Sequence, residues 1–177
     1  MATLSFEKLP VKLALSALMF SISLAMPLHA ADVPLDARAS AREEVQQLVE
    51  RFRHAILMKD GEALRGMFLP GGSWFQVLDG ASLATVRAKK PEARQINSGS
   101  YEKFAKFVET SPAAIEETFD GVRIETDGTV GTVCFDYRFI ADGKQTNHGM
   151  ETWQVIRESD GWKISAMLYS VIRDDIR

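Results

Sequence analysis

Two side chains near the C-terminus have the clearest capacity for chemistry, Glu151 and Tyr137. A glutamate that points into a protein core loses its hydration, which raises its pKa and makes it a candidate general base. A tyrosine near it can donate a hydrogen bond. The alternative is structural: a strand glutamate is often a solvated outer-face residue or an ion-pair partner, here of Arg138 or Lys163, and Tyr137 can simply pack in the core.

Other kinds of reactive site lack their residues. The chain has one cysteine, Cys134, and His54 and His148 fall on different elements, so we predict no metal site. No serine sits in a Gly-flanked nucleophile elbow, and no phosphate loop or dinucleotide fingerprint occurs, so we predict no cofactor. His148 follows a turn, where contact with a ligand at the rim of a site and an exposed loop position are both open. Cys134 is expected to be a buried or half-buried strand residue.

Three strand-like runs joined by short turns contain these residues. The first run (130–141) alternates apolar and polar residues, and Asp142-Gly143 after it is a strong hairpin signal. The second run (145–157) ends at a Glu-Ser-Asp-Gly turn, and the third (162–172) is apolar on both parities. An antiparallel sheet of three such strands needs helices to cover it.

The upstream sequence supplies helices. Apolar residues between Asp36 and Lys59 fall on one face of an amphipathic helix, with His54 outside it. Capping residues predict two shorter helices, one from Gly61 to Phe68 after Asp60 and one after Ser98 or Ser100, ending at Ser111-Pro112.

The remaining upstream segments predict strands and a connection. A strand is expected from Ser73 to Leu78, and another from Ala113 to Glu125 with a bulge at Gly121. Residues 81–99 have no sustained period and predict a long loop or weak hairpin, either a lid or a solvated excursion.

Residues 1–30 predict a secretory signal peptide. Lys8 and Lys12 precede an uncharged apolar run that is shorter than the roughly 20 residues of a membrane-spanning helix. Cleavage after Ala30 leaves one domain (31–177), and the loss of two Lys and one Glu moves the formal net charge from −3 to −4. This charge offers no basic surface to nucleic acid or anionic lipid. We therefore expect a periplasmic or secreted protein without a nucleic-acid partner and, after cleavage, without a membrane partner.

The order of elements resembles the nuclear transport factor 2-like superfamily. That resemblance implies an α+β cone in which a curved antiparallel sheet wraps a long N-terminal helix, with two shorter helices. The passage 52–72, in which Lys59-Asp60 starts the second helix, resembles the superfamily's opening. The later strands are similar to its SnoaL-like, lumazine-binding branch at Val133, Tyr137, Phe139, Gly143-Lys144 and Gly161-Trp162-Lys163-Ile164. The chain departs from that branch at Asp136, where the branch has Pro, and at Asn147-His148-Gly149, where the branch often has His-Cys-Gly.

The resemblance implies a pocket between the concave face of the sheet and the helices. It implies that the last strand points Trp162, Ile164, Ala166, Leu168 and Ser170 inward, and on the neighbouring strands we favour Phe135, Tyr137 and Phe139 with Glu151, Trp153 and Val155. An apolar, aromatic lining with few polar groups suits a small hydrophobic or aromatic molecule. The candidate ligand-binding residues are Trp74, Phe135, Tyr137, His148, Glu151, Trp153, Leu168 and Ser170.

Two functions from different classes follow. The first is an exported small-molecule-binding protein without assigned catalysis, a homodimer through the outer sheet face. The second is a cofactor-independent isomerase, cyclase or hydro-lyase, with Glu151 as general base and Tyr137 as donor to a developing oxyanion, as the resemblance implies. A single candidate carboxylate favours binding. The apolar residues that motivate the dimer are Ile140, Met150, Ile156, Met167 and Val171.

Overall fold

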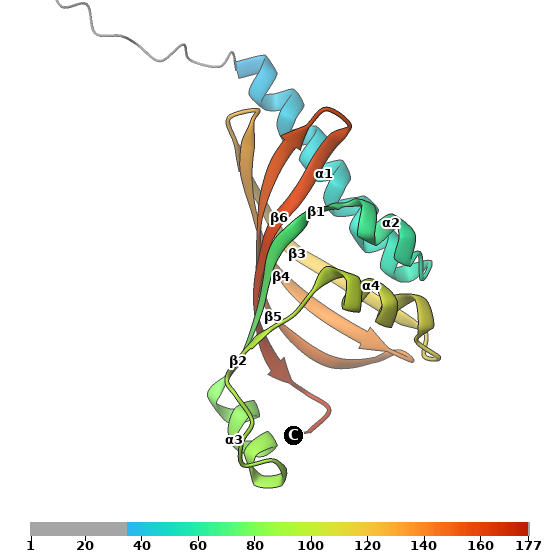
Figure 1. The fold of residues 1–177 in the computed structure, drawn as a ribbon, viewed down its shortest axis with the longest axis vertical. Helices are drawn as coiled ribbons and strands as arrows, with labels where there is room; N and C mark the ends of the chain where they lie inside the picture. The colour runs from blue at the N-terminus through green and yellow to red at the C-terminus, as the bar shows by residue number, and fades with distance from the viewer. Residues whose placement is uncertain (1–34, 177) are drawn as a thin grey trace, which may run out of the picture. The chain divides into compact units, whose positions relative to one another are not determined.

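The computed structural model describes residues 35–176, so the predicted signal peptide lies outside the described residues. This part of the chain forms four helices and six strands, and the last four strands follow one another without a helix. Figure 1 shows their arrangement. The helices are α1 (Leu35–Leu57), α2 (Gly61–Gly66), α3 (Gly80–Lys89) and α4 (Tyr101–Thr110). The strands are β1 (Phe68–Leu78), β2 (Ile96–Ser98), β3 (Ile115–Thr126), β4 (Val130–Ala141), β5 (Lys144–Glu158) and β6 (Gly161–Arg173). Within residues 35–176 no helix combines the length and apolar character needed to cross a membrane.

The strands form one curved sheet in the order β2-β1-β6-β5-β4-β3. The predicted three-stranded meander is present as β4, β5 and β6, and β3 adds to it by a further antiparallel pairing. Every neighbouring pair is antiparallel except β1 and β6, which run parallel and so correct the purely antiparallel expectation. The α+β fold with a curved sheet is as predicted.

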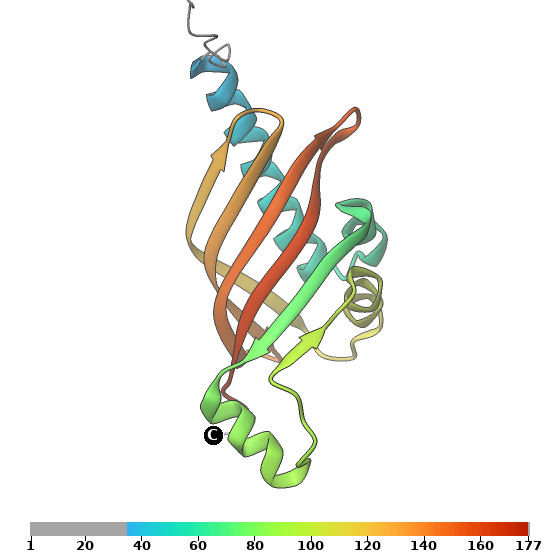
Figure 2. The same ribbon diagram turned by 60° about the vertical axis from the view of Figure 1, so that its left-hand side comes forward.

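The long helix α1 lies across the concave face of this sheet (Figures 1 and 2). The apolar face of α1 lies inside the core, and no residue of that face is more than 3% exposed. His54 lies off this face and is exposed, as predicted. Each large apolar side chain buried in this way contributes about 1.5–3 kcal/mol. The stripe is Val45, Leu48, Val49, Phe52, Ala55 and Ile56.

The predicted capping residues begin the short helices α2 and α4. The Asp60 carboxylate accepts a hydrogen bond from the Ala63 backbone N–H at 2.8 Å, and the Ser100 hydroxyl accepts one from the Lys103 N–H at 3.2 Å. Each cap satisfies a backbone donor that the helix leaves free. The bulge expected in β3 is also present, because Gly121 has a φ of +64° where the pairing with β4 shifts register.

Helix α3 corrects the expectation of a loop at residues 81–99, so the structure has three short helices instead of two. Asp79 is its cap, since the carboxylate oxygens accept from the Ala81 and Ser82 N–H groups. Ser82 and Leu83 are buried, and the Ser82 hydroxyl accepts a hydrogen bond from the Arg173 N–H at 2.8 Å. The helix thereby joins the end of β6, away from α1 (Figure 1).

Candidate functional site

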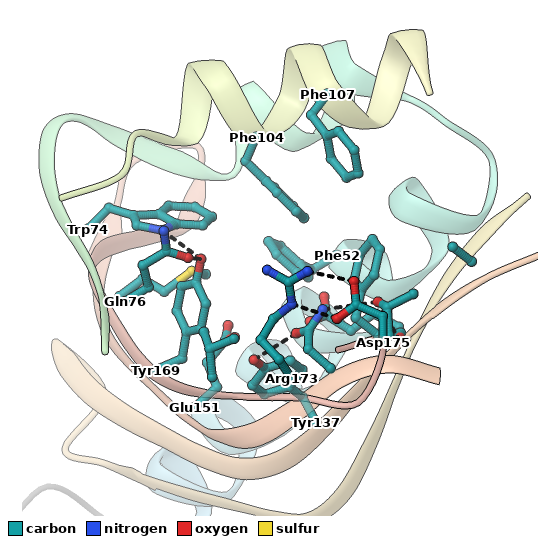
Figure 3. Close-up of a pocket in the computed structure, with 17 residues that line it drawn as sticks. Phe52, Trp74, Gln76, Phe104, Phe107, Tyr137, Glu151, Tyr169, Arg173 and Asp175 are labelled. Carbon is teal, nitrogen blue, oxygen red and sulfur yellow. Dashed lines mark hydrogen bonds and ion pairs between the residues drawn. The ribbon is translucent and has the colours of Figure 1, made fainter. Parts of the chain in front are cut away.

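A cavity of about 560 Å³ opens between the sheet and the helices α1 and α4. Phe104 and Phe107 project from α4 on one side, and Tyr137, Glu151 and Tyr169 rise from the strands on the other (Figure 3). The elements are far apart in the sequence, so the site exists only once the sheet has curved around α1.

The cavity wall is mostly aromatic. Phe104 lies between Phe52, at 6.0 Å between ring centroids, and Trp74, at 5.3 Å. Rings at these separations contact one another and hold a defined geometry. The other rings that line the cavity are Phe107, Tyr137, Phe139 and Tyr169.

One end of the cavity carries a chain of hydrogen bonds between side chains. The Trp74 indole N–H donates to the Tyr169 hydroxyl at 3.2 Å, and that hydroxyl donates to the Gln76 side-chain amide oxygen at 3.1 Å. Burial raises the pKa of Tyr169 well above its ordinary value, so the phenol keeps its proton. The Tyr169 hydroxyl proton is therefore occupied by its hydrogen bond to Gln76.

Tyr137 is also bound within the wall. Its hydroxyl lies 3.0 Å from the Asn147 side-chain oxygen and 3.0 Å from the Ser170 backbone carbonyl. A phenol has one proton and donates to one of these acceptors at a time. Burial, and then the charges of Glu151 and Glu117, raise the pKa of Tyr137 far above its ordinary value.

Glu151 is buried, only 3% exposed, and lines the cavity. Burial raises the pKa of its carboxyl to about 7, although a hydrogen bond donated by the Trp153 indole N–H opposes this shift. The alternative ion-pair partners are engaged elsewhere, Arg138 with Asp120 and Lys163 with Asp160. The inward orientation that a general base would need is therefore present.

A second buried carboxyl, Glu117 of β3, lines the same cavity and was not among the candidates. It is 5% exposed, and among the residues that the structure describes its carboxyl has no hydrogen-bond or ion-pair partner. Burial, and then the nearby charge of Glu151, raise its pKa well above the ordinary value. The sequence held a signal, because Glu117 shares strand parity with Ile115 and Phe119, which face the core side.

A bulge at Ser165 corrects the inward row expected on β6. The pairing with β5 runs from Gln154 opposite Ala166 to Val155 opposite Ile164, so Ser165 is the extra residue. An extra residue exchanges the two faces of a strand beyond it. Trp162 and Ile164 are buried as predicted, but beyond the bulge Met167, Tyr169 and Val171 line the cavity.

Two predicted ligand-binding residues on β6 consequently lie on the wrong face. Leu168 is 50% exposed on the outer face. The Ser170 hydroxyl accepts a hydrogen bond from the Met150 backbone N–H and does not line the cavity. The same exchange removes Met167 and Val171 from the expected dimer surface, because both are buried.

The other predicted residues take varied positions. Trp74 lines the cavity, whereas Phe135 and Trp153 pack in the core beside it without lining it. His148 also lies outside the lining, and its Nδ1 atom is 2.7 Å from the Asp174 carboxylate. Cys134 is half-buried on β4, as expected.

Arg173 and Asp175 line the cavity and neutralise each other as an ion pair. Arg173 donates to Asp175 through two nitrogens, at 2.6 and 2.5 Å. Within residues 35–176 no group of three or more His, Cys, Asp or Glu side chains is placed to hold a metal ion. Among the described residues that line the cavity, the one cationic side chain, Arg173, is thus paired with Asp175 and not with either glutamate.

Comparison with known proteins supports the fold through structure alone. No protein-family model matches the chain, and a search of curated proteins gives no match. Among solved structures, an NTF2-like protein of unknown function from Pseudomonas putida KT2440 is 13% identical, with 77% of this chain and 96% of that chain covered at a TM-score of 0.59. A protein of unknown function from Mycobacterium tuberculosis is 19% identical, with 81% and 78% covered at a TM-score of 0.58.

A third solved structure is similar to this chain in its fold. It is an NTF2-like protein with a cystatin-like fold from Novosphingobium aromaticivorans, 14% identical, with 76% of this chain and 83% of that chain covered at a TM-score of 0.56. At such identities a likeness establishes architecture and not chemistry. The chain has the nuclear transport factor 2-like fold.

Proposed function

We propose that the chain is an exported small-molecule-binding protein whose cavity takes a small hydrophobic or aromatic molecule. The observation that carries the proposal is the aromatic cavity of about 560 Å³. Its volume falls within the roughly 300–1,000 Å³ of small-ligand sites, which are mostly apolar with a few placed polar groups. The hydrogen bonds of Trp74, Tyr137 and Tyr169 within the wall favour a preformed site, which lowers the ordering cost of binding.

The test is the native mass spectrum of residues 31–177, purified gently from an exporting host, together with a matched pair of variants. Phe107 lines the cavity and is 48% exposed, so Phe107→Ala removes a ligand contact at small cost to the core. Phe75→Ala removes a similarly exposed ring from the outer face. We expect a retained molecule whose occupancy falls about tenfold in Phe107→Ala and not in Phe75→Ala. An empty wild-type protein whose unfolding temperature no aromatic compound raises would contradict the proposal.

Export belongs to the same proposal and rests on residues 1–30. We expect the full-length chain, expressed in a bacterial host, to appear outside the cytoplasm with an intact mass that begins at Ala31. Retention of residues 1–30 on a cytoplasmic product would remove export and leave the binding function to its own test.

A second candidate is a cofactor-independent isomerase, cyclase or hydro-lyase with Glu151 as base and Tyr137 as donor. It is favoured by the Glu151 pKa of about 7, since a base with a pKa near the working pH transfers protons efficiently. It is disfavoured by Tyr137, whose single proton already lies between two protein acceptors. Glu151→Gln that binds the retained molecule normally but loses its turnover would support catalysis, and unchanged turnover would remove Glu151 from the mechanism.

A further inference from the structure

The two buried carboxyls of the cavity keep acceptor atoms that no donor of the wall uses. The indole of Trp74 and the hydroxyls of Tyr137 and Tyr169 donate to other groups in the wall. The Glu117 carboxyl, in contrast, has neither a hydrogen bond nor an ion pair within the described part of the chain. Glu151 receives one bond, from the Trp153 indole to Oε1, which leaves Oε2 to the cavity. A ligand that complements these groups carries donors.

The charged groups that line the cavity also favour a ligand with a positive charge. The titratable groups that line it are Glu117 on β3, Tyr137 on β4, Glu151 on β5, Tyr169 and Arg173 on β6, and Asp175 after β6. The only cation among them, Arg173, is paired with Asp175. The lining residues from α1, α4 and β1 are Phe52, Phe104, Phe107, Trp74 and Gln76, which do not titrate. Just outside, Asp174 is paired with His148. Two buried acids therefore face the cavity without a compensating charge.

The aromatic wall adds to this preference. The π face of an aromatic ring carries negative charge density, so rings of Trp, Tyr and Phe attract a cation within about 6 Å. The Trp74 ring contacts Phe104 and Tyr169, with centroid separations of 5.3 Å and 5.9 Å. Rings and carboxylates together form the kind of site that binds an alkylammonium group attached to an apolar body.

Building on the proposed binding function, we infer that the cavity selects hydrophobic organic cations, in which an ammonium N–H group pairs with Glu117 and Glu151 while an aromatic body lies among the rings. A buried carboxylate is costly without a partner and stable when it is paired and hydrogen-bonded. The ammonium supplies both the charge and the donors that these two carboxyls lack.

Proton release accompanies this binding. In the empty protein, burial raises the pKa of both carboxyls, and the charge of Glu151 raises that of Glu117 further, so protons are held on the pair around neutral pH. A bound ammonium lowers those pKa values and displaces a proton to solvent. Affinity for an amine that stays charged should therefore rise as the pH increases from about 6 to about 8.

The experiment is a matched panel measured by calorimetry on the mature chain. Benzene, naphthalene and biphenyl are each tested as the aminomethyl, hydroxymethyl and carboxylic acid derivative, so that shape is nearly constant while charge changes. We expect each amine to bind at least about tenfold more tightly than its alcohol. The acids should bind more weakly than the alcohols. Amine binding should strengthen with pH, whereas alcohol binding should weaken or stay level.

Glutamine variants test whether the two glutamates cause the preference for amines. Glu117→Gln and Glu151→Gln keep the side-chain volume, and each should reduce the preference for amine over alcohol by about tenfold while alcohol affinity changes by less than about threefold. Glu116→Gln is the control, because Glu116 is the neighbouring glutamate on the other parity of β3 and does not line the cavity.

The outcomes separate the inference from the proposed function. Alcohols or acids that bind as tightly as the amines would overturn the cation preference and leave small-molecule binding in place. An amine preference that survives both Gln variants would overturn the assignment to these carboxyls. A panel in which nothing binds would overturn the inference and count against the proposed function as well.

Discussion

Glu117 and Glu151 place two buried carboxyls in one mostly aromatic cavity. Neither strand presents a positive partner to them. Protons can keep the pair neutral, which makes stability depend on pH. A cationic ligand can instead compensate the charges, which makes ligand affinity depend on pH.

We expect the free energy of unfolding to fall as the pH rises, because folding raises the pKa of both glutamates. The folded protein holds the Glu151 proton with a pKa of about 7, above the value of about 4.3 in the unfolded chain, and the Glu117 pKa is raised too. The stability from the Glu151 proton is thus fully present below about pH 4 and is lost as the pH rises through about 7, and the raised Glu117 pKa acts in the same direction. For Glu151 alone, the loss of unfolding free energy is on the order of 4 kcal/mol.

Urea unfolding between about pH 5 and about pH 8 measures this slope. Glu117→Gln and Glu151→Gln cannot ionise, so each should flatten the curve and be more stable than wild type at the alkaline end. Glu116→Gln should keep the wild-type slope. Equal slopes in all four proteins would show that folding does not raise the pKa of either carboxyl.

Residue-level prediction from the sequence succeeded where strand parity is unbroken. Glu151 and Tyr137 face inward as their strands' alternation indicates. The same alternation indicates an inward position for Glu117, whereas alternation alone places Leu168 and Ser170 on the wrong face. The bulge that moves them occurs at Ser165, a residue type that carries no bulge signal.

Strands β5 and β6 lie close together at Gly149. A Cβ atom there would lie 2.1 Å from the backbone carbonyl oxygen of Ser170, which also receives the Tyr137 hydroxyl bond. Gly149→Ala should therefore separate the two strands and lower the free energy of unfolding by about 1–3 kcal/mol or more. Chemical denaturation measures the change.

The control for this prediction is Gly80→Ala. No heavy atom lies within 4 Å of a Cβ built at Gly80, the first residue of α3. Alanine restricts the unfolded chain and should leave stability unchanged or raise it by up to about 1 kcal/mol. If Gly149→Ala were equally harmless, the close approach of the two strands would be wrong.

Helix α3 offers a test of the element that the sequence did not predict. Asp79→Ala removes the bonds to the Ala81 and Ser82 N–H groups, and a lost cap costs about 1 kcal/mol. Hydrogen exchange should accelerate along residues 80–89 more than in the sheet. Glu92→Ala, at an exposed position after the helix, should leave the exchange pattern unchanged. Uniform acceleration over the whole chain would mean that α3 does not open separately.

The helix was missed because its apolar face is small. Only Ser82 and Leu83 are buried, so residues 80–89 show no stripe of the kind that identifies α1. Asp79-Gly80 resembles a turn, but it is the cap of a helix held by the end of β6 through Arg173. Tertiary contact decides the conformation here, and periodicity alone does not report it.

At the scale of the whole molecule, strand β6 carries two surfaces. Beyond Ser165 its inward residues line the cavity, and the outward Leu168 lies between Phe75 of β1 and Thr152 of β5. Leu168, Phe75 and Met150 are 50%, 43% and 51% exposed, so this outer face remains apolar after the correction of Met167 and Val171. Exposed apolar side chains gathered on one face are typical of an interface.

The last prediction is that the mature chain forms a homodimer through this outer face. A stable dimer needs roughly 1,200–2,000 Å² of buried surface with a well-packed apolar centre, which Leu168 and Phe75 would supply. Leu168→Glu places a charge at that centre and should shift the protein to monomer in sedimentation equilibrium at high micromolar concentration. Leu57→Glu is the control, because Leu57 is similarly exposed but ends α1. Since Leu168 points away from the cavity, amine affinity should survive in the monomer. A wild-type protein that is monomeric at that concentration would exclude the dimer, and a loss of affinity in Leu168→Glu would mean that the two faces of β6 are coupled.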